Sequence, residues 1–214
     1  MTIITSPQKI LVTGGHGDIA QAIKNKLQPS YAVFTPNKEI LDVTNEAQIE
    51  KCMSRCKPDI LINCAGYIEP LSLENLTIDN LRKHIDINLI GSAMCAKYAI
   101  QYGATFIINI GSSAGVRAKK TWLSYCISKG ALNKLTECIM LEGTDAVTLH
   151  LSRTDTQMRA KLFPNEGKEL LLTPTQVADA VDEILRYQSQ IKGKHLLLRQ
   201  CNYYENKKWM LEVI

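Results

Sequence analysis

Long apolar runs are missing from the 214-residue chain, and none approaches the roughly 20 residues that a membrane-spanning helix needs. The N-terminal segment, residues 1–9, lacks a basic stretch followed by an apolar one, so the sequence predicts no secretory signal. The seven cysteines are odd in number and include no Cys-x-x-Cys pair. Cys52 and Cys56 lie one helical turn apart, without a second Cys or His pair at zinc spacing. These absences favour free thiols in a reducing cytoplasm, no membrane partner and no metal site.

A strong charge of one sign is lacking as well. The formal net charge is only +4, and no run mixes basic with aromatic side chains, so nucleic acid is not an expected partner. His84, His150 and His195 share no metal-ligand spacing. Apolar residues make up 45% of the chain, which is ordinary for a globular protein. This length suffices for one sizeable core, and we expect a single domain over residues 1–214.

What the chain does contain is an alternation of short apolar runs with amphipathic segments. The runs predict seven strands, at 9–13, 31–35, 40–43, 59–64, 105–110, 146–151 and 195–199. The segments between them predict helices, at 19–27, 46–56, 78–101, 122–141 and 173–187. Residues 201–214 have no clear period. The pattern predicts a doubly wound, Rossmann-like α/β domain with a parallel sheet of about seven strands and a ligand beyond the strands' carboxyl ends.

A glycine-rich turn joins the first predicted strand to the first predicted helix. Glycine lets the backbone approach a diphosphate, and the N-terminus of a helix offers free N–H groups. Asp18 suits the helix dipole but not a phosphate, and a plain strand–helix turn is the alternative. His16 could contact a ribose phosphate or be solvated. The residues expected to bind a dinucleotide here are Gly14, Gly15, His16, Gly17, Asp18 and Ile19.

Two side chains suited to proton transfer stand four residues apart. Tyr125 and Lys129 would share a face of the predicted helix, and Ser112 lies thirteen residues before the tyrosine. Two further Tyr-x-x-x-Lys pairs occur near the C-terminus, Tyr203/Lys207 and Tyr204/Lys208. The residues thirteen before those tyrosines are glutamine and isoleucine, which cannot polarise a carbonyl. Tyr125 is therefore the candidate. Taken singly, each of these residues could equally be a turn, helix or packing residue.

Together these motifs resemble those of the short-chain dehydrogenase/reductase family over about residues 9–198. The matching segments, in chain order, are the glycine turn 13–20, Asp42-Val43, Asn63-Cys64-Ala65-Gly66, Asn88, Ser112 with Gly115, and Tyr125-x-x-x-Lys129. The glycine spacing, Gly-x-x-Gly-x-x-Ala, resembles that of extended or atypical members. Leu151-Ser152 replaces the Pro-Gly often found after the sixth strand. The resemblance implies an oxidoreductase that transfers hydride between a nicotinamide cofactor and a carbonyl or alcohol.

The resemblance also implies roles for single residues. Tyr125 would be the general acid or base, and Ser112 would hydrogen-bond the substrate oxygen. The ammonium of Lys129 is expected to lower the pKa of Tyr125 from about 10 toward working pH. Asn88 would anchor a water between Lys129 and solvent. The other residues expected to bind the cofactor are Lys38, Asp42, Val43, Asn63, Ala65, Gly66, Tyr125, Lys129 and Thr156. Asn109 is expected to be structural.

The cofactor is predicted to be NADP, with NAD as the alternative. NAD enzymes usually carry an acidic residue after the second strand, and this chain has none before Glu39. Lys38 or His16 could meet a 2′-phosphate, although Lys38 could also be an exposed loop residue. A regulatory or scaffold protein that binds a dinucleotide without turnover is the competing class, and such relatives typically lose the tyrosine or the lysine.

The substrate is expected to be a small carbonyl compound or alcohol, with an anionic one as a second hypothesis. Six cations flank the predicted site: Arg117, Lys119, Lys120, Arg153, Arg159 and Lys161. They would attract a sugar phosphate, a nucleotide-sugar or a thioester carried on phosphopantetheine, unless they are solvated or serve only the cofactor's phosphates. The helix at 122–141 is apolar on more than one face, and family members commonly pair through such helices. We therefore expect a homodimer or homotetramer.

Overall fold

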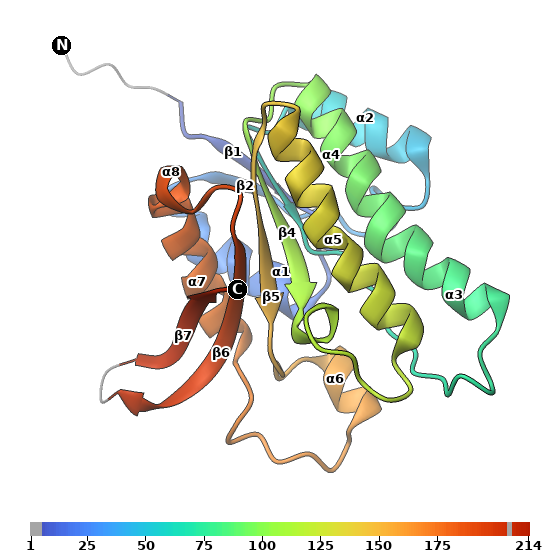
Figure 1. Cartoon of the computed structure of the whole chain (residues 1–214). Coiled ribbons are helices and arrows are strands. Elements are labelled where there is room, and N and C mark those ends of the chain that lie inside the picture. Colours follow the sequence, from blue (N-terminus) through green and yellow to red (C-terminus); the bar gives the residue numbers. More distant parts are fainter. Residues whose placement is uncertain (1–5, 205–206) are drawn as a thin grey trace.

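The computed structural model describes residues 6–204 and 207–214. Its centre is a seven-stranded sheet in the order β2-β1-β3-β4-β5-β6-β7, with helices on both faces (Figure 1). The strands are β1 Lys9–Val12, β2 Ala32–Phe34, β3 Ile60–Asn63, β4 Phe106–Ser112, β5 Asp145–Leu151, β6 His195–Tyr204 and β7 Lys207–Val213. The helices are α1 Asp18–Leu27, α2 Glu46–Cys56, α3 Ile78–Ile85, α4 Gly91–Gln101, α5 Leu123–Leu141, α6 Gln157–Leu162, α7 Pro174–Arg186 and α8 Gln188–Ile191. The doubly wound α/β domain expected from the sequence is confirmed.

Two predictions about the sheet are wrong. The predicted strand at 40–43 is absent, because side-chain hydrogen bonds hold the segment in turns: Asn37 accepts from the N–H of Ile40, and Asp42 accepts from the N–H of Thr44. The seventh strand is instead β7, which pairs antiparallel with β6, so the sheet is not wholly parallel. Residues 201–214, which show no period, thus form the far edge of the sheet, and the short β2 is the other edge.

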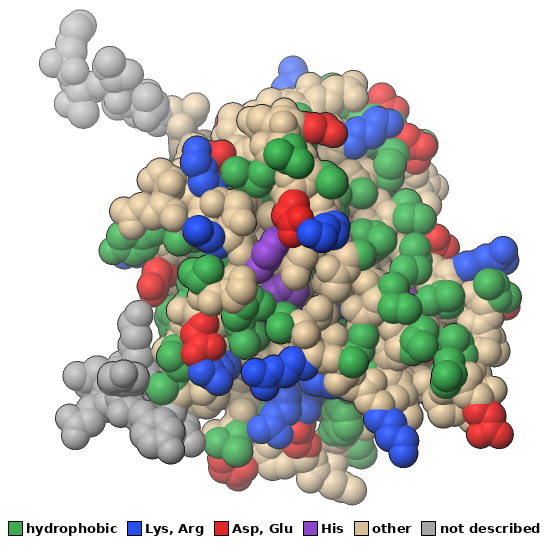
Figure 2. All heavy atoms as spheres, viewed as in Figure 1, with side chains coloured by type: hydrophobic (Ala, Val, Ile, Leu, Met, Phe, Trp, Pro, Cys, Tyr) green, Lys and Arg blue, Asp and Glu red, His purple; other side chains and the backbone are tan. Residues whose placement is uncertain are grey.

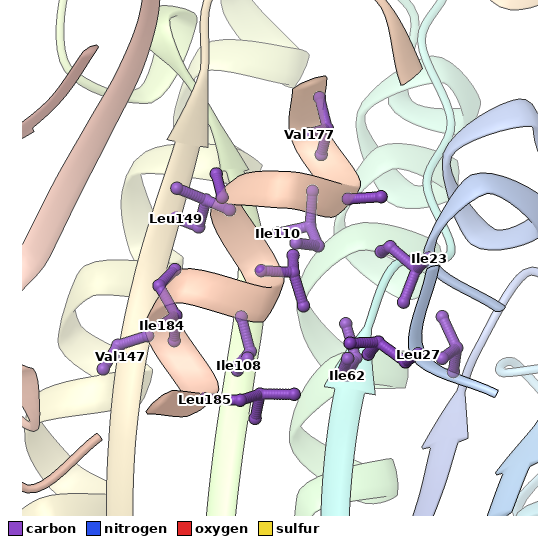
Figure 3. Close-up of a cluster of buried hydrophobic side chains, with 14 of the residues drawn as sticks. Ile23, Leu27, Ile62, Ile108, Ile110, Val147, Leu149, Val177, Ile184 and Leu185 are labelled. Atoms are coloured by element: carbon purple, nitrogen blue, oxygen red, sulfur yellow. The ribbon is translucent and has the colours of Figure 1, made fainter. Parts of the chain in front are cut away.

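The central strands are apolar on both faces because helices cover both. Alternate residues of one strand enter two different cores, so that Ile10 and Val12 face one layer while Leu11 faces the other. The first core lies between the sheet and α1 and α7, where Ile23, Leu27, Val177, Ile184 and Leu185 meet the strand residues (Figure 3). The second lies under α2, α4 and α5 and contains Ile49, Met53 and Ile139. The two cores fix the sheet and both helical layers as one unit.

The helix starts follow local sequence signals. Thr173 accepts a hydrogen bond from the N–H of Gln176, and the Gln176 side chain accepts from the N–H of Thr173. This capping box, with Pro174 at the first helical position, begins α7 where the sequence predicts it. The predicted long helix at 78–101 is present but contains a π-helical turn, Asp86–Ile90, between α3 and α4. Among the described residues, no helix combines the length and the apolar character needed to cross a bilayer.

Candidate active site

The carboxyl ends of the parallel strands point toward α6 and the loop that follows it (Figure 1). The ends of β1 and β3 are joined by Thr13, whose hydroxyl oxygen accepts hydrogen bonds from the N–H groups of Cys64 and Ala65, both at 2.9 Å. The segment after β3 is thereby held against the glycine turn. The predicted site residues of these two segments share this edge of the sheet.

Close backbone contacts explain the glycine turn. Gly14 has φ +74°, and a Cβ there would lie 2.9 Å from the Cα of Ala65. At Gly15, a Cβ would lie 2.2 Å from the carbonyl oxygen of Thr35, and the Gly15 N–H donates to the carbonyl oxygen of Pro36 at 3.1 Å. The turn is therefore pressed against the ends of both β2 and β3. It forms a cradle that side chains would fill.

The N-terminus of α1 is open to a ligand. Its N-cap residue, Gly17, has no side chain to bond the first N–H groups of the helix. Asp18 does not cap it either, since its carboxylate accepts from the Gln157 backbone N–H at 2.7 Å and from the Gln157 side chain at 3.4 Å. The predicted contact of Asp18 with a cofactor is thus limited to its backbone, while its side chain joins α1 to α6. Free N–H groups beside a glycine cradle fit a diphosphate.

Ser112, Tyr125 and Lys129 come together at the end of β4 and on α5. Ser112 and Lys129 are buried, and Tyr125 is half-buried. A side-chain hydrogen bond links Ser112 to Tyr125, and the Lys129 ammonium donates to the carbonyl oxygen of Ile110 at 2.8 Å. Trp122 packs edge-on against Tyr125, with ring centroids 5.6 Å apart. A hydroxyl pair beside a buried amine is an arrangement that can hold a carbonyl oxygen and move a proton to it.

The expected lowering of the Tyr125 pKa does not occur in the protein alone. Burial raises the pKa of Tyr125 above its ordinary value, and the hydrogen bond from Ser112 only partly opposes this. Burial also lowers the pKa of Lys129 to about 8, slightly offset by the nearby Cys64. The ammonium bonds to Ile110, and desolvation, which opposes charge on both groups, outweighs any attraction between them. Tyr125 is therefore a protonated phenol at neutral pH.

Asn88 lies within the π-helical turn and binds protein groups with its whole amide. Its oxygen accepts from the Tyr67 N–H at 2.7 Å, and its nitrogen donates to the Tyr67 carbonyl oxygen and to the Ser128 hydroxyl, both at 2.9 Å. Ser128 in turn donates to the carbonyl oxygen of Tyr125 at 3.0 Å. Asn88 thus connects the segment after β3 to α5, and the water predicted to lie between it and Lys129 stays a prediction.

Two glycines let the end of β4 touch α5 backbone to backbone. A Cβ at Gly115 would lie 2.7 Å from the carbonyl carbon of Lys129, and one at Gly130 would lie 3.2 Å from the Gly115 carbonyl oxygen. No side chain fits between these two segments of the backbone. This contact fixes the distance from Ser112 to the helix that carries Tyr125.

The buried His150 supports Ser112 from the neighbouring strand. Its Nδ1 lies 3.2 Å from the Ser112 nitrogen and 2.9 Å from the Ser112 carbonyl oxygen, and its Nε2 lies 2.7 Å from the side-chain oxygen of Asn133. Burial lowers the pKa of His150 to about 4, so the ring is neutral at physiological pH. Gly111 is required beside it, because a Cβ there would lie 2.5 Å from Nδ1.

Asn63, predicted to bind the cofactor, has its side chain in the protein interior. Its amide nitrogen donates to the Ser92 carbonyl oxygen at 3.0 Å and to the side-chain oxygen of Asn109 at 2.9 Å. Asn109 continues the chain of bonds to the hydroxyl of Thr136 at 2.9 Å, so its expected structural role is confirmed. A contact of Asn63 with a ligand would therefore involve its backbone. Ala65 and Gly66, by contrast, lie half-buried at the open edge of the sheet.

The remaining predicted cofactor residues are more dispersed. Lys38 is 81% exposed and forms an ion pair with Asp42 at 3.5 Å, while Val43 is buried in the core under α2. His16 is exposed at the glycine turn. Thr156 caps α6 by accepting from the Arg159 N–H at 3.2 Å. The rival pairs Tyr203/Lys207 and Tyr204/Lys208 have side chains outside the part of the chain that the structure describes.

A cavity of about 150 Å³ opens between the end of β4, α5 and α6. It is lined by Ser112, Tyr125 and Lys129 on one side, and by Met158 and Leu162 of α6 on the other. Ile19, Gly66, Tyr67, Trp122 and Thr156 complete much of the wall. The start of α1, the segment after β3, the hydroxyl pair and α6 therefore border one space.

Comparison with known proteins bears directly on this geometry. The model of the family described as short chain dehydrogenase matches residues 4–167, most of the chain. The chain belongs to the short chain dehydrogenase family. It is an oxidoreductase of that family, and a second comparison agrees: an uncharacterized oxidoreductase of Schizosaccharomyces pombe is 30% identical over 196 residues, covering 78% of this chain and 79% of the relative.

Solved structures of short chain dehydrogenase type share the fold. ElxO with NADP bound has a TM-score of 0.79 at 22% identity, covering 90% of this chain and 97% of its own. A 4-hydroxyisoleucine dehydrogenase complexed with NADH has a TM-score of 0.77 at 22% identity, covering 89% of this chain and 96% of its own. The likeness spans nearly the whole domain.

Several residues of this short chain dehydrogenase site were missed from the sequence. Thr13 was included only as part of the turn, and Ser128 and Trp122 were not singled out. Trp122 and Ser128 stand three residues before and after Tyr125, on the same helical face, so the i, i+3 spacing could have identified both. Tyr67 directly follows the Ala65-Gly66 motif, but no sequence signal shows that its backbone binds Asn88.

Proposed function

We propose that the protein is an NADP-dependent oxidoreductase that interconverts a carbonyl compound and a secondary alcohol. The observation that carries the proposal is the hydrogen-bonded Ser112–Tyr125 pair beside the buried Lys129, all three lining one cavity with Ile19 of α1 and Gly66 after β3. Family membership supports the reaction class. The nicotinamide cofactor, when bound, supplies or accepts the hydride.

The residues present fit such a cofactor. The cradle at Gly14 and Gly15 and the uncapped N-terminus of α1 suit the diphosphate. Lys129, Gly66 and Thr156 line the cavity, so these residues would hold the ribose and nicotinamide end. The side chains of Asp18 and Asn63 are engaged elsewhere and contribute only backbone groups.

The hydroxyl pair would perform the proton transfer. In reduction, Ser112 hydrogen-bonds the carbonyl oxygen, and Tyr125 donates its proton to that oxygen as negative charge develops there. The raised pKa of Tyr125 suits this acid role, because the proton is present at neutral pH. In oxidation the phenolate must form, and positive charge on the oxidised nicotinamide ring would favour it. Asn88 and Ser128 hold the backbone around Tyr125 in place.

The test of the proposal is a screen of ketones, aldehydes and secondary alcohols that follows NADPH absorbance, repeated with NADH. Turnover of at least one carbonyl compound by the purified protein is expected. Cofactor binding with no turnover of any compound, in either direction, would instead support the dinucleotide-binding protein without chemistry.

We predict that NADP is preferred over NAD. No acidic side chain directly follows β2, and Lys38 is exposed on that segment. Its pair with Asp42 is a surface ion pair, which contributes about 0–1 kcal/mol, so a 2′-phosphate could draw the ammonium away. Lys38→Ala should weaken NADP more than NAD, whereas Lys134→Ala on α5 should leave both unchanged. The measurement is the ratio of the two catalytic efficiencies, and a ratio favouring NAD in the wild type contradicts the prediction.

We also predict a homodimer or homotetramer. The outer surface of α5 exposes Ile127 and Leu141, at 51% and 89%, and Ile100 of α4 is 36% exposed. Light scattering at micromolar concentration should give at least twice the chain mass of 23.9 kDa. Ile127→Lys should shift the protein toward the monomer, while Ile40→Lys, at the opposite edge of the sheet, should not. A wild-type mass near that of one chain would reject the prediction.

A further inference from the structure

Three of the six cations noted in the sequence line the cavity, and three do not. Lys119, Arg153 and Arg159 border the same space as Ser112 and Tyr125. Arg117, Lys120 and Lys161 are exposed and lie outside that lining. Figure 2 shows Lys and Arg side chains gathered at the α6 end of the molecule, where the strands' carboxyl ends lie. The cations that border the cavity are therefore Lys119, Arg153 and Arg159, and these three are called the cationic subset below.

The positive charge of this subset is only partly neutralised by the described residues. Glu166 is half-buried and is shared by both arginines, at 2.7 Å from Arg159 and 3.4 Å from Arg153. Lys119 forms no salt bridge with any described residue. Burial lowers the pKa of Lys119, and the nearby Arg159 lowers it further. Two of the three cations thus share one carboxylate and Lys119 has none, so net positive charge remains at the cavity for an anionic ligand to neutralise.

Aromatic rings hold two of these cations near the proposed proton donor. The Lys119 ammonium lies 4.9 Å from the centroid of the Trp122 ring, and the centroid of the Tyr125 ring lies 5.6 Å from the same ring. Arg159 lies 4.7 Å from the Phe163 ring, which stacks on Trp122 at 6.1 Å. The Trp122 ring therefore contacts both Lys119 and Tyr125, and all three residues line the same cavity. A small molecule can reach both.

We propose that Lys119, Arg153 and Arg159 bind a carboxylate or phosphate group of the substrate, at the end remote from the carbonyl that Tyr125 protonates. This inference rests on the proposed function and adds the substrate class to it. In the proposed function the cofactor's own phosphates would bind elsewhere, the diphosphate at the glycine turn and the 2′-phosphate at Lys38. Guanidinium and ammonium groups around a cavity recognise such anions by charge-assisted hydrogen bonds.

Isothermal titration of NADP-saturated protein with inorganic phosphate, and separately with succinate, tests the proposal. At least one of the two anions should bind the wild type at millimolar concentrations. Lys119→Met keeps the apolar stem on Trp122 and removes the charge, and Arg153→Gln keeps the bulk of a loop side chain. Each should weaken that binding about tenfold or more. Lys119→Arg should restore it, and the matched controls Arg117→Gln and Lys120→Met should bind as the wild type does.

Three results would overturn the proposal. Equal anion binding by Lys119→Met and the wild type would show that Lys119, Arg153 and Arg159 are not the anion site. The failure of both anions to bind NADP-saturated protein would show the same. Anion binding that occurs only without NADP would show that these three cations bind the cofactor rather than the substrate. Tyr125→Phe separates this test from that of the function, since it should abolish turnover and leave anion binding intact.

Where a keto acid is turned over, its methyl ester should show a higher KM, and added salt should raise the KM of the acid alone.

Discussion

Tyr125→Phe is expected to lower turnover about 10²- to 10⁴-fold, the usual contribution of a positioned general acid. Phenylalanine keeps the ring that packs against Trp122 and removes only the hydroxyl that hydrogen-bonds Ser112. The fold and the affinity for NADPH should therefore be unchanged, because the glycine turn and Lys129 are untouched. The measurement is the steady-state rate with a substrate found in the screen, beside a fluorescence titration of NADPH.

The control for this variant is Tyr187→Phe, which removes a hydroxyl from a tyrosine that is 49% exposed at the end of α7. Its turnover should equal that of the wild type. Near-normal turnover by Tyr125→Phe would reject the assignment of the proton donor. Loss of both turnover and NADPH binding would indicate a structural role for the hydroxyl instead.

Gly15→Ala should raise the dissociation constant for NADPH about tenfold or more and lower the free energy of unfolding by about 1–3 kcal/mol. The added Cβ would lie 2.2 Å from the Thr35 carbonyl oxygen and 2.6 Å from that of Pro36, and both are backbone atoms that cannot rotate away. The turn must move off the end of β2 and lose the Gly15–Pro36 hydrogen bond. NADPH titration and urea unfolding measure the two effects.

Gly167→Ala is the matched control, because its Cβ would meet only the carboxylate of Glu169, the far end of a flexible side chain. It should behave as the wild type in both measurements. A folded Gly15→Ala protein with wild-type affinity would show that the turn does not hold the diphosphate.

The elements that the sequence predicts best are those with strong local signals. Strands buried on both faces, such as 60–63 and 106–112, are continuous apolar runs, and α7 begins with a complete capping box. The errors arise where tertiary context decides. Residues 40–43 are apolar enough for a strand, but Leu41 and Val43 are buried under α2 while Asn37 and Asp42 form turns. β7 pairs with β6 at the edge of the sheet, and residues 201–214 show no hydrophobic periodicity from which this strand could be predicted.

The same division applies to the site. Ser112, Tyr125 and Lys129 are brought together as their spacing predicts, because i and i+4 positions share a helical face and β4 ends beside α5. The sequence does not reveal that the Asp18 carboxylate accepts a hydrogen bond from Gln157, or that the Asn63 amide donates one to Asn109. Nor does it show that burial reverses the expected pKa shift of Tyr125. Each depends on which groups the fold places opposite one another.

The contact between Gly115 and Gly130 limits how this enzyme can acquire new substrates. Since the two backbones touch, a side chain at Gly115 would push the segment after Ser112 away from α5, and we expect it to lower turnover of any substrate. The opposite wall has no such restriction, because Met158 and Leu162 reach the cavity from the short α6, and Met158 is 45% exposed. Natural divergence and laboratory selection for altered specificity should therefore accumulate changes in α6 and the loop after it, and leave the wall formed by β4 and α5 as it is.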